Sequence, residues 1–253
     1  MSTSSAPLTD SRVMLCRNLK HIIRNPVTIF NAALMPVVLM LLLVYVFGNA
    51  FSVGEHYVDY ATPGLIVLAI CYGLSGTAVS VSSDMTKGII NRFKVMNVSR
   101  GAVLTGHVVA TTLISSIAIA VIIGMAFALG FRSPASPLDW LGAIGIALAA
   151  AFAAAWLTVA LGMAAKTPES AGLTVVPLLL LPFVSSAVVP ADKMGQGIRQ
   201  FAEYQPFTPI IESLRGLLAG TPSGGYAAAA LAWCAGIALV GYLWSRSTFS
   251  KRA

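Results

Sequence analysis

A short basic segment, residues 84–100, holds the side chains best suited to binding a partner. Its apolar residues recur on one helical face at steps of four, four and three: Met85, Ile89, Phe93 and Met96. Polar side chains occupy the opposite side or its margin: Lys87, Asn91, Arg92 and Lys94. Ser83 can cap the start, and Asp84 favours the positive end of the helix dipole. The pattern predicts a short amphipathic helix; the alternative is a basic loop that only enforces membrane topology.

A second structured segment is expected at residues 190–222. Thr208 can cap a helix that begins at Pro209. The wide apolar face of that helix contains Ile210, Ile211, Leu214, Leu217 and Leu218. Gly220, Thr221 and Pro222 would end it. This helix either rests on the outer membrane surface or dips back into the outer leaflet.

Enzymatic chemistry and ion coupling are both disfavoured. The phosphate-binding pattern G-x-x-x-x-G-K-[ST] does not occur in the sequence, so ATP hydrolysis by that route is excluded. The apolar stretches contain no Asp, Glu, Lys or Arg, which ion-driven carriers commonly place within their spans. Their one ionisable candidate, His107, is expected to be a packed or interfacial residue rather than a proton relay. No catalytic residue or metal site is predicted, and a transporter of this kind needs an external motor.

The elements that must position these segments are membrane-spanning helices. Of the 253 residues, 57% are hydrophobic and 10% charged, and the mean hydropathy is +0.82. Six charge-free intervals exceed eighteen residues: 25–54, 60–83, 101–131, 140–165, 170–191 and 216–245. Each can hold one span of about 20 residues. We expect an all-α integral membrane protein with one domain over 1–253 and spans at about 26–48, 61–82, 103–130, 140–165, 170–190 and 225–245.

Charge placement predicts the orientation of these spans. Six spans put both termini on one side, and twelve of the sixteen Lys and Arg residues fall on that side. Both termini are therefore expected in the cytoplasm, in a multi-pass protein of the cell membrane. This asymmetry explains the pI near 9.6 without nucleic-acid binding. Residues 8–24 are expected to form a basic amphipathic helix at the lipid interface, or else an N-terminal extension of the first span.

Two motifs carry a resemblance to a known family. Asp84, Lys87-Gly88, Ile89-Ile90, Arg92-Phe93-Lys94 and Ser99-Arg100 resemble the first cytoplasmic loop of ABC-2-type exporter permeases, particularly the daunorubicin-resistance group. Asn91 and Asn97 depart from that pattern, where an acid and a proline are usual. The second motif resembles the stretch that group carries before its last span. It comprises Gln205, Pro206, Phe207, Thr208 and Pro209, and continues through Glu212 and Arg215.

The resemblance implies the permease subunit of an ATP-driven exporter for a hydrophobic or amphipathic drug, antibiotic or lipid-like solute. Segment 84–100 would be a coupling helix that docks on a cytoplasmic ATPase, present in two copies, and that partner would bind ATP and Mg. Residues 191–220 would form short re-entrant helices that cover the exit. A second permease copy or a paralogue would complete the path. The rival functions are a non-transporting scaffold or sensor and, less favoured, a channel or ion-coupled carrier.

Substrate contacts are the least constrained prediction. Within the spans, aromatic and hydroxyl side chains could line a path for an amphipathic solute: Tyr72, Ser75, Thr77, Phe183 and Ser185. The same residues could equally serve as ordinary packing and local hydrogen bonds. Small-residue patterns at Ala120, Gly124 and Ala128, and at Ala232 and Gly236, predict close helix packing. Packing within one subunit is the more frequent use of such patterns, and contact between two subunits is the alternative.

Overall fold

The computed structural model describes residues 26–47, 57–86, 100–190 and 193–252. These residues form helices and no strand. The elements are α2 (Pro26–Leu42), the π-helical turn η1 (Leu43–Phe47), α3 (Tyr57–Thr86), α5 (Arg100–Ala128), α6 (Pro137–Ala164), α7 (Pro168–Thr174), α8 (Val176–Leu180), the 3-10 turn η2 (Leu181–Val184), α9 (Gln196–Tyr204), α10 (Phe207–Leu218) and α11 (Gly224–Arg252). The predicted interfacial helix 8–24 and residues 87–99 of the predicted coupling helix lie outside the described residues.

Four of these helices, α3, α5, α6 and α11, are long and apolar enough to cross a membrane. They confirm the all-α membrane fold. Two shorter apolar stretches, Leu34–Val46 and Pro168–Val184, correspond to the predicted first and fifth spans. The count of six spans stays a prediction.

The fifth apolar stretch is broken. It divides into α7, α8 and η2, with Val175 between the first two helices and Pro177 and Pro182 in the later pieces. Proline removes a backbone donor and clashes with the preceding turn, so a continuous helix is disfavoured there. The chain leaves helical geometry at Ser185, whose backbone is extended.

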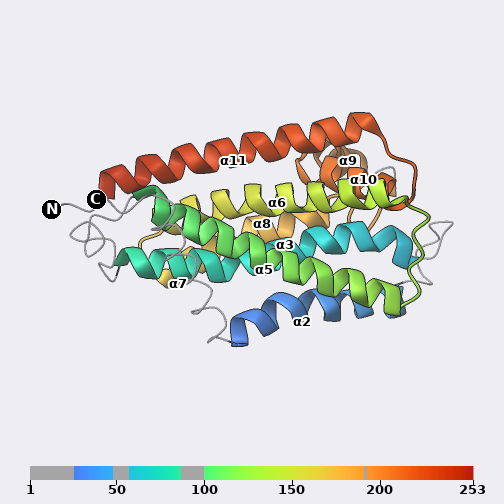
Figure 1. Ribbon diagram of the computed structural model, residues 1–253, viewed down its shortest axis with the longest axis horizontal. Coiled ribbons are helices and arrows are strands. Elements are labelled where there is room, and N and C mark those ends of the chain that lie inside the picture. Colours follow the sequence, from blue (N-terminus) through green and yellow to red (C-terminus); the bar gives the residue numbers. More distant parts are fainter. Residues whose placement is uncertain (1–25, 48–56, 87–99, 191–192, 253) are drawn as a thin grey trace.

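The helices pack lengthwise into one bundle (Figure 1). α6 packs against α11, α3 and α5, while α2 lies against α3 and α5. α3 is the most buried of the four long helices and α11 the least. The short helices α9 and α10 gather at one end of the bundle, which we call the hairpin end (Figure 1). Helix α11 finishes at the opposite end, which we call the terminal end (Figure 1).

Three glycines let backbones approach closely within the bundle. A Cβ on Gly162 would lie 2.7 Å from the carbonyl oxygen of Ala78, and one on Gly64 would lie 2.5 Å from that of Ala187. On α11, a Cβ on Gly241 would lie 2.7 Å from the backbone nitrogen of Leu157 in α6. Because backbone atoms cannot rotate aside, no larger residue fits without moving a helix.

The small-residue patterns noted in the sequence are not these contact points. Ala120, Gly124 and Ala128 lie on the exposed side of α5, and Ala232 and Gly236 are exposed on α11. A Cβ on Gly124 or Gly236 would meet no heavy atom of the described residues within 4 Å. The expectation that these patterns pack within the chain was therefore wrong, because helical spacing alone does not reveal which side faces a neighbour.

The contrast between two glycines of α11 gives a matched test. Gly241→Ala should destabilise the protein by roughly 1–3 kcal/mol, since overpacking forces α11 away from α6. Gly236→Ala should be neutral or slightly stabilising, because alanine favours a helix where there is space. The measurement is the temperature at which each purified variant loses its monodisperse state in the same detergent. Equal shifts in the two variants would contradict the close contact at Gly241.

Candidate functional site

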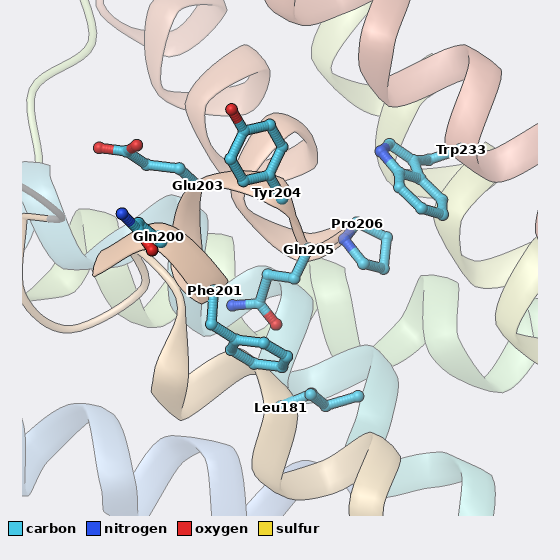
Figure 2. Close-up of a pocket in the computed structure, with 8 residues that line it drawn as sticks. All are labelled: Leu181, Gln200, Phe201, Glu203, Tyr204, Gln205, Pro206 and Trp233. Carbon is cyan, nitrogen blue, oxygen red and sulfur yellow. The ribbon is translucent and has the colours of Figure 1, made fainter. Parts of the chain in front are cut away.

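The helices α9 and α10 form a hairpin that turns back along the bundle. The turn between them, at Gln205 and Pro206, lies beside Trp233 (Figure 2). Trp233 is nine residues into α11, about 14 Å along the axis from Gly224 at 1.5 Å per residue. α10 then runs back toward the hairpin end. There the Ser133 hydroxyl donates to the carbonyl of Leu218, the last residue of α10, at 2.5 Å. The hairpin thus enters the bundle instead of lying across its end.

The apolar face predicted for α10 is the face that packs. α10 contacts α3, α6 and α11. Its buried residues are Thr208, Pro209, Ile210, Ile211, Ser213, Leu214 and Leu218. Gly220 follows the helix with φ +68, so the predicted stop is confirmed.

The predicted start of α10 was wrong. The helix begins at Phe207, and its N-cap is Pro206, which makes no side-chain cap bond. Thr208 is buried within the first turn, and its hydroxyl has no hydrogen-bond partner among the described residues. Pro209 costs little here because the first four backbone donors of a helix have no intrahelical acceptor. Just before this start, the buried side chain of Gln205 donates to the carbonyl of Val184 at 2.8 Å.

Side chains of the hairpin and of α3 donate hydrogen bonds to the backbone carbonyls at the point where the fifth apolar segment leaves helical geometry. Besides Val184, the carbonyl of Ser186 accepts from Arg215 at 2.8 Å and from the Tyr60 hydroxyl at 2.9 Å. The Tyr57 hydroxyl donates to the carbonyl of Val188 at 3.3 Å. Backbone carbonyls freed from a helix in an apolar medium need such partners. Residues 184–188, which we call the break segment, are held by side chains of α3, of α10 and of the turn between α9 and α10.

Arg215 is the centre of this arrangement. Its guanidinium also donates to the carbonyl of Tyr60 at 3.2 Å and lies 3.9 Å from the centre of the Tyr60 ring. On α10 itself it forms an ion pair with Glu212. The Arg215 side chain is only 18% exposed. Sequence reasoning selected Arg215 and Glu212 by resemblance, but nothing in the sequence pointed to Tyr60 or to the break-segment carbonyls.

A pocket of about 890 Å³ opens beside the hairpin turn (Figure 2). Its lining residues are Leu181, Gln200, Phe201, Glu203, Tyr204, Gln205, Pro206 and Trp233. Phe201, Tyr204 and Trp233 supply exposed aromatic surface. Glu203 is paired with Arg199 at 2.7 Å, and the side-chain oxygen of Gln205 has no hydrogen-bond partner among the described residues. This chemistry suits a molecule with an apolar body and a few polar groups.

Sequence reasoning found only Gln205 and Pro206 of this pocket. The rest of the pocket could have been suggested by Phe201 and Tyr204. They are three residues apart in a largely polar stretch, and this spacing places both aromatic rings on one face of α9.

The five predicted path residues differ in burial and in hydrogen bonding, and their role in a substrate path stays a prediction. The Thr77 hydroxyl is buried and hydrogen-bonded to Thr111 at 2.8 Å, and the Ser185 hydroxyl donates to Pro182 at 2.5 Å. Phe183 packs against the hydrophobic core. Tyr72 is half-buried and Ser75 exposed on α3. The hydroxyls of Thr77 and Ser185 are thus already engaged in hydrogen bonds within the chain.

The start of the predicted coupling helix also needs correction. α3 continues to Thr86, so Ser83, Asp84 and Met85 belong to that helix and not to a new one. Asp84 is buried, and its carboxylate lies 3.2 Å from Nε2 of His107 in α5. The charged residue Asp84 was taken as the start of a new helix. Instead α3 continues past Asp84, whose carboxylate has the buried partner His107. Lys87, Gly88, Ile89, Arg92, Phe93, Lys94 and Met96 lie outside the described residues.

Arg215 offers a test of the hairpin anchor. Arg215→Ala should destabilise the protein by roughly 1–3 kcal/mol, because it leaves the carbonyls of Ser186 and Tyr60 short of a charged donor. Arg199→Ala, which removes an exposed ion pair on α9, should change stability by less than about 1 kcal/mol. Thermal unfolding of both variants in the same detergent makes the comparison. An Arg215→Ala protein as stable as Arg199→Ala would rule out Arg215 as the anchor.

Comparisons with known proteins agree with this arrangement. The family model described as ABC-2 type transporter matches residues 9–219. The chain is 29% identical over 198 residues to the daunorubicin resistance ABC transporter permease protein DrrB1 of Streptomyces coeruleorubidus, covering 78% of this chain and 70% of the relative. It is 28% identical over 246 residues to the probable doxorubicin resistance ABC transporter permease protein DrrC of Mycobacterium tuberculosis, covering 94% of this chain and 88% of the relative. Since the family match spans most of the sequence, the chain belongs to the ABC-2 type transporter family.

Proposed function

We propose that this chain is the membrane-spanning permease subunit of an ATP-driven exporter that moves a hydrophobic or amphipathic solute out of the cell. The observation that carries the proposal is family membership over residues 9–219. Relatives with 70% and 88% of their length aligned are named as drug-resistance permeases. Their names favour a drug or antibiotic as cargo over an ion or a small metabolite.

The motor in this proposal is a separate ATPase. The sequence has no phosphate-binding loop, and its charge-free intervals offer no carboxylate or basic residue for ion coupling. ATP and Mg would be bound by the partner, of which two copies would act on two permease chains. These chains are either two copies of this one or this one with a paralogue. Residues 87–99, between α3 and α5, are the segment that we assign to docking.

The orientation follows from charge. The terminal end of the bundle would be cytoplasmic, because Lys and Arg concentrate in the segments that connect there. The hairpin end would then face the exterior. In this orientation α9 and α10 reach inward from the outer surface and cover the exit, in agreement with the depth of Gln205 beside Trp233.

The aromatic pocket at the hairpin turn suits the last step of export. Phe201, Tyr204 and Trp233 provide apolar contact, while Gln200 and Glu203 provide polar contact (Figure 2). An amphipathic solute leaving the bundle would meet both kinds of surface there. The pocket volume of about 890 Å³ falls in the range of sites for drug-sized ligands.

The docking segment provides the decisive experiment. Phe93→Asp should abolish co-purification of the tagged chain with its ATPase, since it places a charge on the apolar side of the predicted helix. Asn91→Asp, which adds the same charge on the opposite side, should retain the ATPase. The readout is the amount of ATPase recovered per permease from detergent-solubilised membranes.

Both variants must reach the membrane at the wild-type level for this comparison to hold. Retention of the ATPase by Phe93→Asp would refute docking through the apolar side. A wild-type chain that captures no ATPase would instead overturn the exporter proposal and favour a non-transporting scaffold.

A further inference from the structure

A buried hydrogen bond between two ionisable side chains joins the two helices that flank the docking segment. The carboxylate of Asp84, in the last turn of α3, lies 3.2 Å from Nε2 of His107 in α5. Their side chains are 11% and 7% exposed. Among the described residues, no other Asp, Glu, Lys, Arg or His is buried. Because an ionisable group inside an apolar bundle is costly, a role beyond packing is the first hypothesis to test.

The pair lies at a position that matters for force transmission. Asp84 precedes residues 87–99 and His107 follows them, 23 positions further along the chain. With the carboxylate ionised, Nε2 carries the hydrogen and donates it to the carboxylate. This bond is directional, so it fixes the rotation of one helix against the other, which an apolar contact does not.

Hydrogen bonds extend this connection along the same two helices. The Thr111 hydroxyl donates to the carbonyl of His107 at 2.8 Å. Since that uses its one hydrogen, Thr77 of α3 must donate to Thr111 across the 2.8 Å that separates their oxygens. A continuous series of polar contacts therefore holds α3 and α5 together from Asp84 to Thr77.

The remaining long helices meet beside the pair. A buried cluster there combines Val81 of α3, Leu104 and Val108 of α5, Trp156, Val159 and Met163 of α6, and Phe249 of α11. Met85, next to Asp84, packs against this cluster. A displacement of the joined ends of α3 and α5 would therefore press directly on α6 and α11.

We propose that Asp84 and His107 are positioning residues for transport: their hydrogen bond clamps α3 to α5, so that movement of the docking segment between them shifts both helices as one unit. This inference rests on the proposed exporter function. Without the clamp, a push on the segment would move one helix end past the other. ATP hydrolysis would continue, but less of it would be converted into transport.

The double variant Asp84→Leu with His107→Leu separates positioning from stability. Replacing both partners of a buried polar pair with apolar residues is often neutral or stabilising, so this variant should insert and unfold at or above the wild-type temperature. The assay uses the chain with its ATPase in proteoliposomes and doxorubicin as the probe. We expect the ATP hydrolysed per doxorubicin transported to rise about fivefold or more.

Two further variants complete the test. The exchanged pair, Asp84→His with His107→Asp, should restore the wild-type ratio because it rebuilds the contact. Ser82→Ala, two residues from Asp84, should leave the ratio unchanged, because its buried hydroxyl has no hydrogen-bond partner among the described residues.

The outcomes distinguish the two proposals. A double-leucine variant with the wild-type ratio, or an exchanged pair no better than the double-leucine variant, would overturn the clamp while leaving the exporter function in place. A wild-type complex that shows no ATP-dependent movement of amphipathic solutes, doxorubicin included, would overturn the proposed function, and the clamp with it.

Discussion

The carbonyls of the break segment, which are largely buried and lack helical donors, are the constraint on which the hairpin end depends. Prolines 177 and 182 make a continuous fifth helix unfavourable, so residues 184–188 lose the hydrogen bonds that a helix would provide. Water is not available inside an apolar bundle to replace them. The partners come instead from Tyr57, Tyr60, Gln205 and Arg215. The path of the hairpin follows from this need, because Gln205 and Arg215 reach these carbonyls only if α10 lies within the bundle.

The long helices were predictable from sequence because their signal is local. Charge-free intervals require no knowledge of neighbours, and they identified the regions of α3, α5, α6, α11 and the fifth apolar stretch. Their boundaries were less accurate for a physical reason. α6 begins at Pro137, before the charged Asp139, because Asp139 forms a capping box with Ser136. A charge can thus start a helix as well as interrupt a span.

The site was less predictable because its contacts are between distant parts of the chain. Arg215 and Tyr60 are 155 positions apart, and the pattern around each gives no sign of the other. Asp84 was assigned to a cytoplasmic helix because a lone carboxylate is expected outside the membrane. Its burial makes sense only once His107 is placed beside it. Likewise, Gly236 and Gly241 are indistinguishable in sequence, and only the approach of α6 shows which one forms the contact.

Helix α3 connects the docking segment with the break segment, the two sites that act in the proposed export cycle. It carries Tyr57, Tyr60 and Gly64 against the break segment at one end and Asp84 beside the docking segment at the other. At 1.5 Å per residue its 30 residues extend about 45 Å, enough to cross the membrane. Gly64 leaves no space between α3 and the backbone of Ala187, and Gly162 leaves none at Ala78. An axial or rotational shift imposed at Asp84 therefore cannot be absorbed by loose packing along the helix. In the proposed cycle it would reach the carbonyl of Ser186, to which Tyr60 and Arg215 both donate, so the exit hairpin would respond to the ATPase through α3.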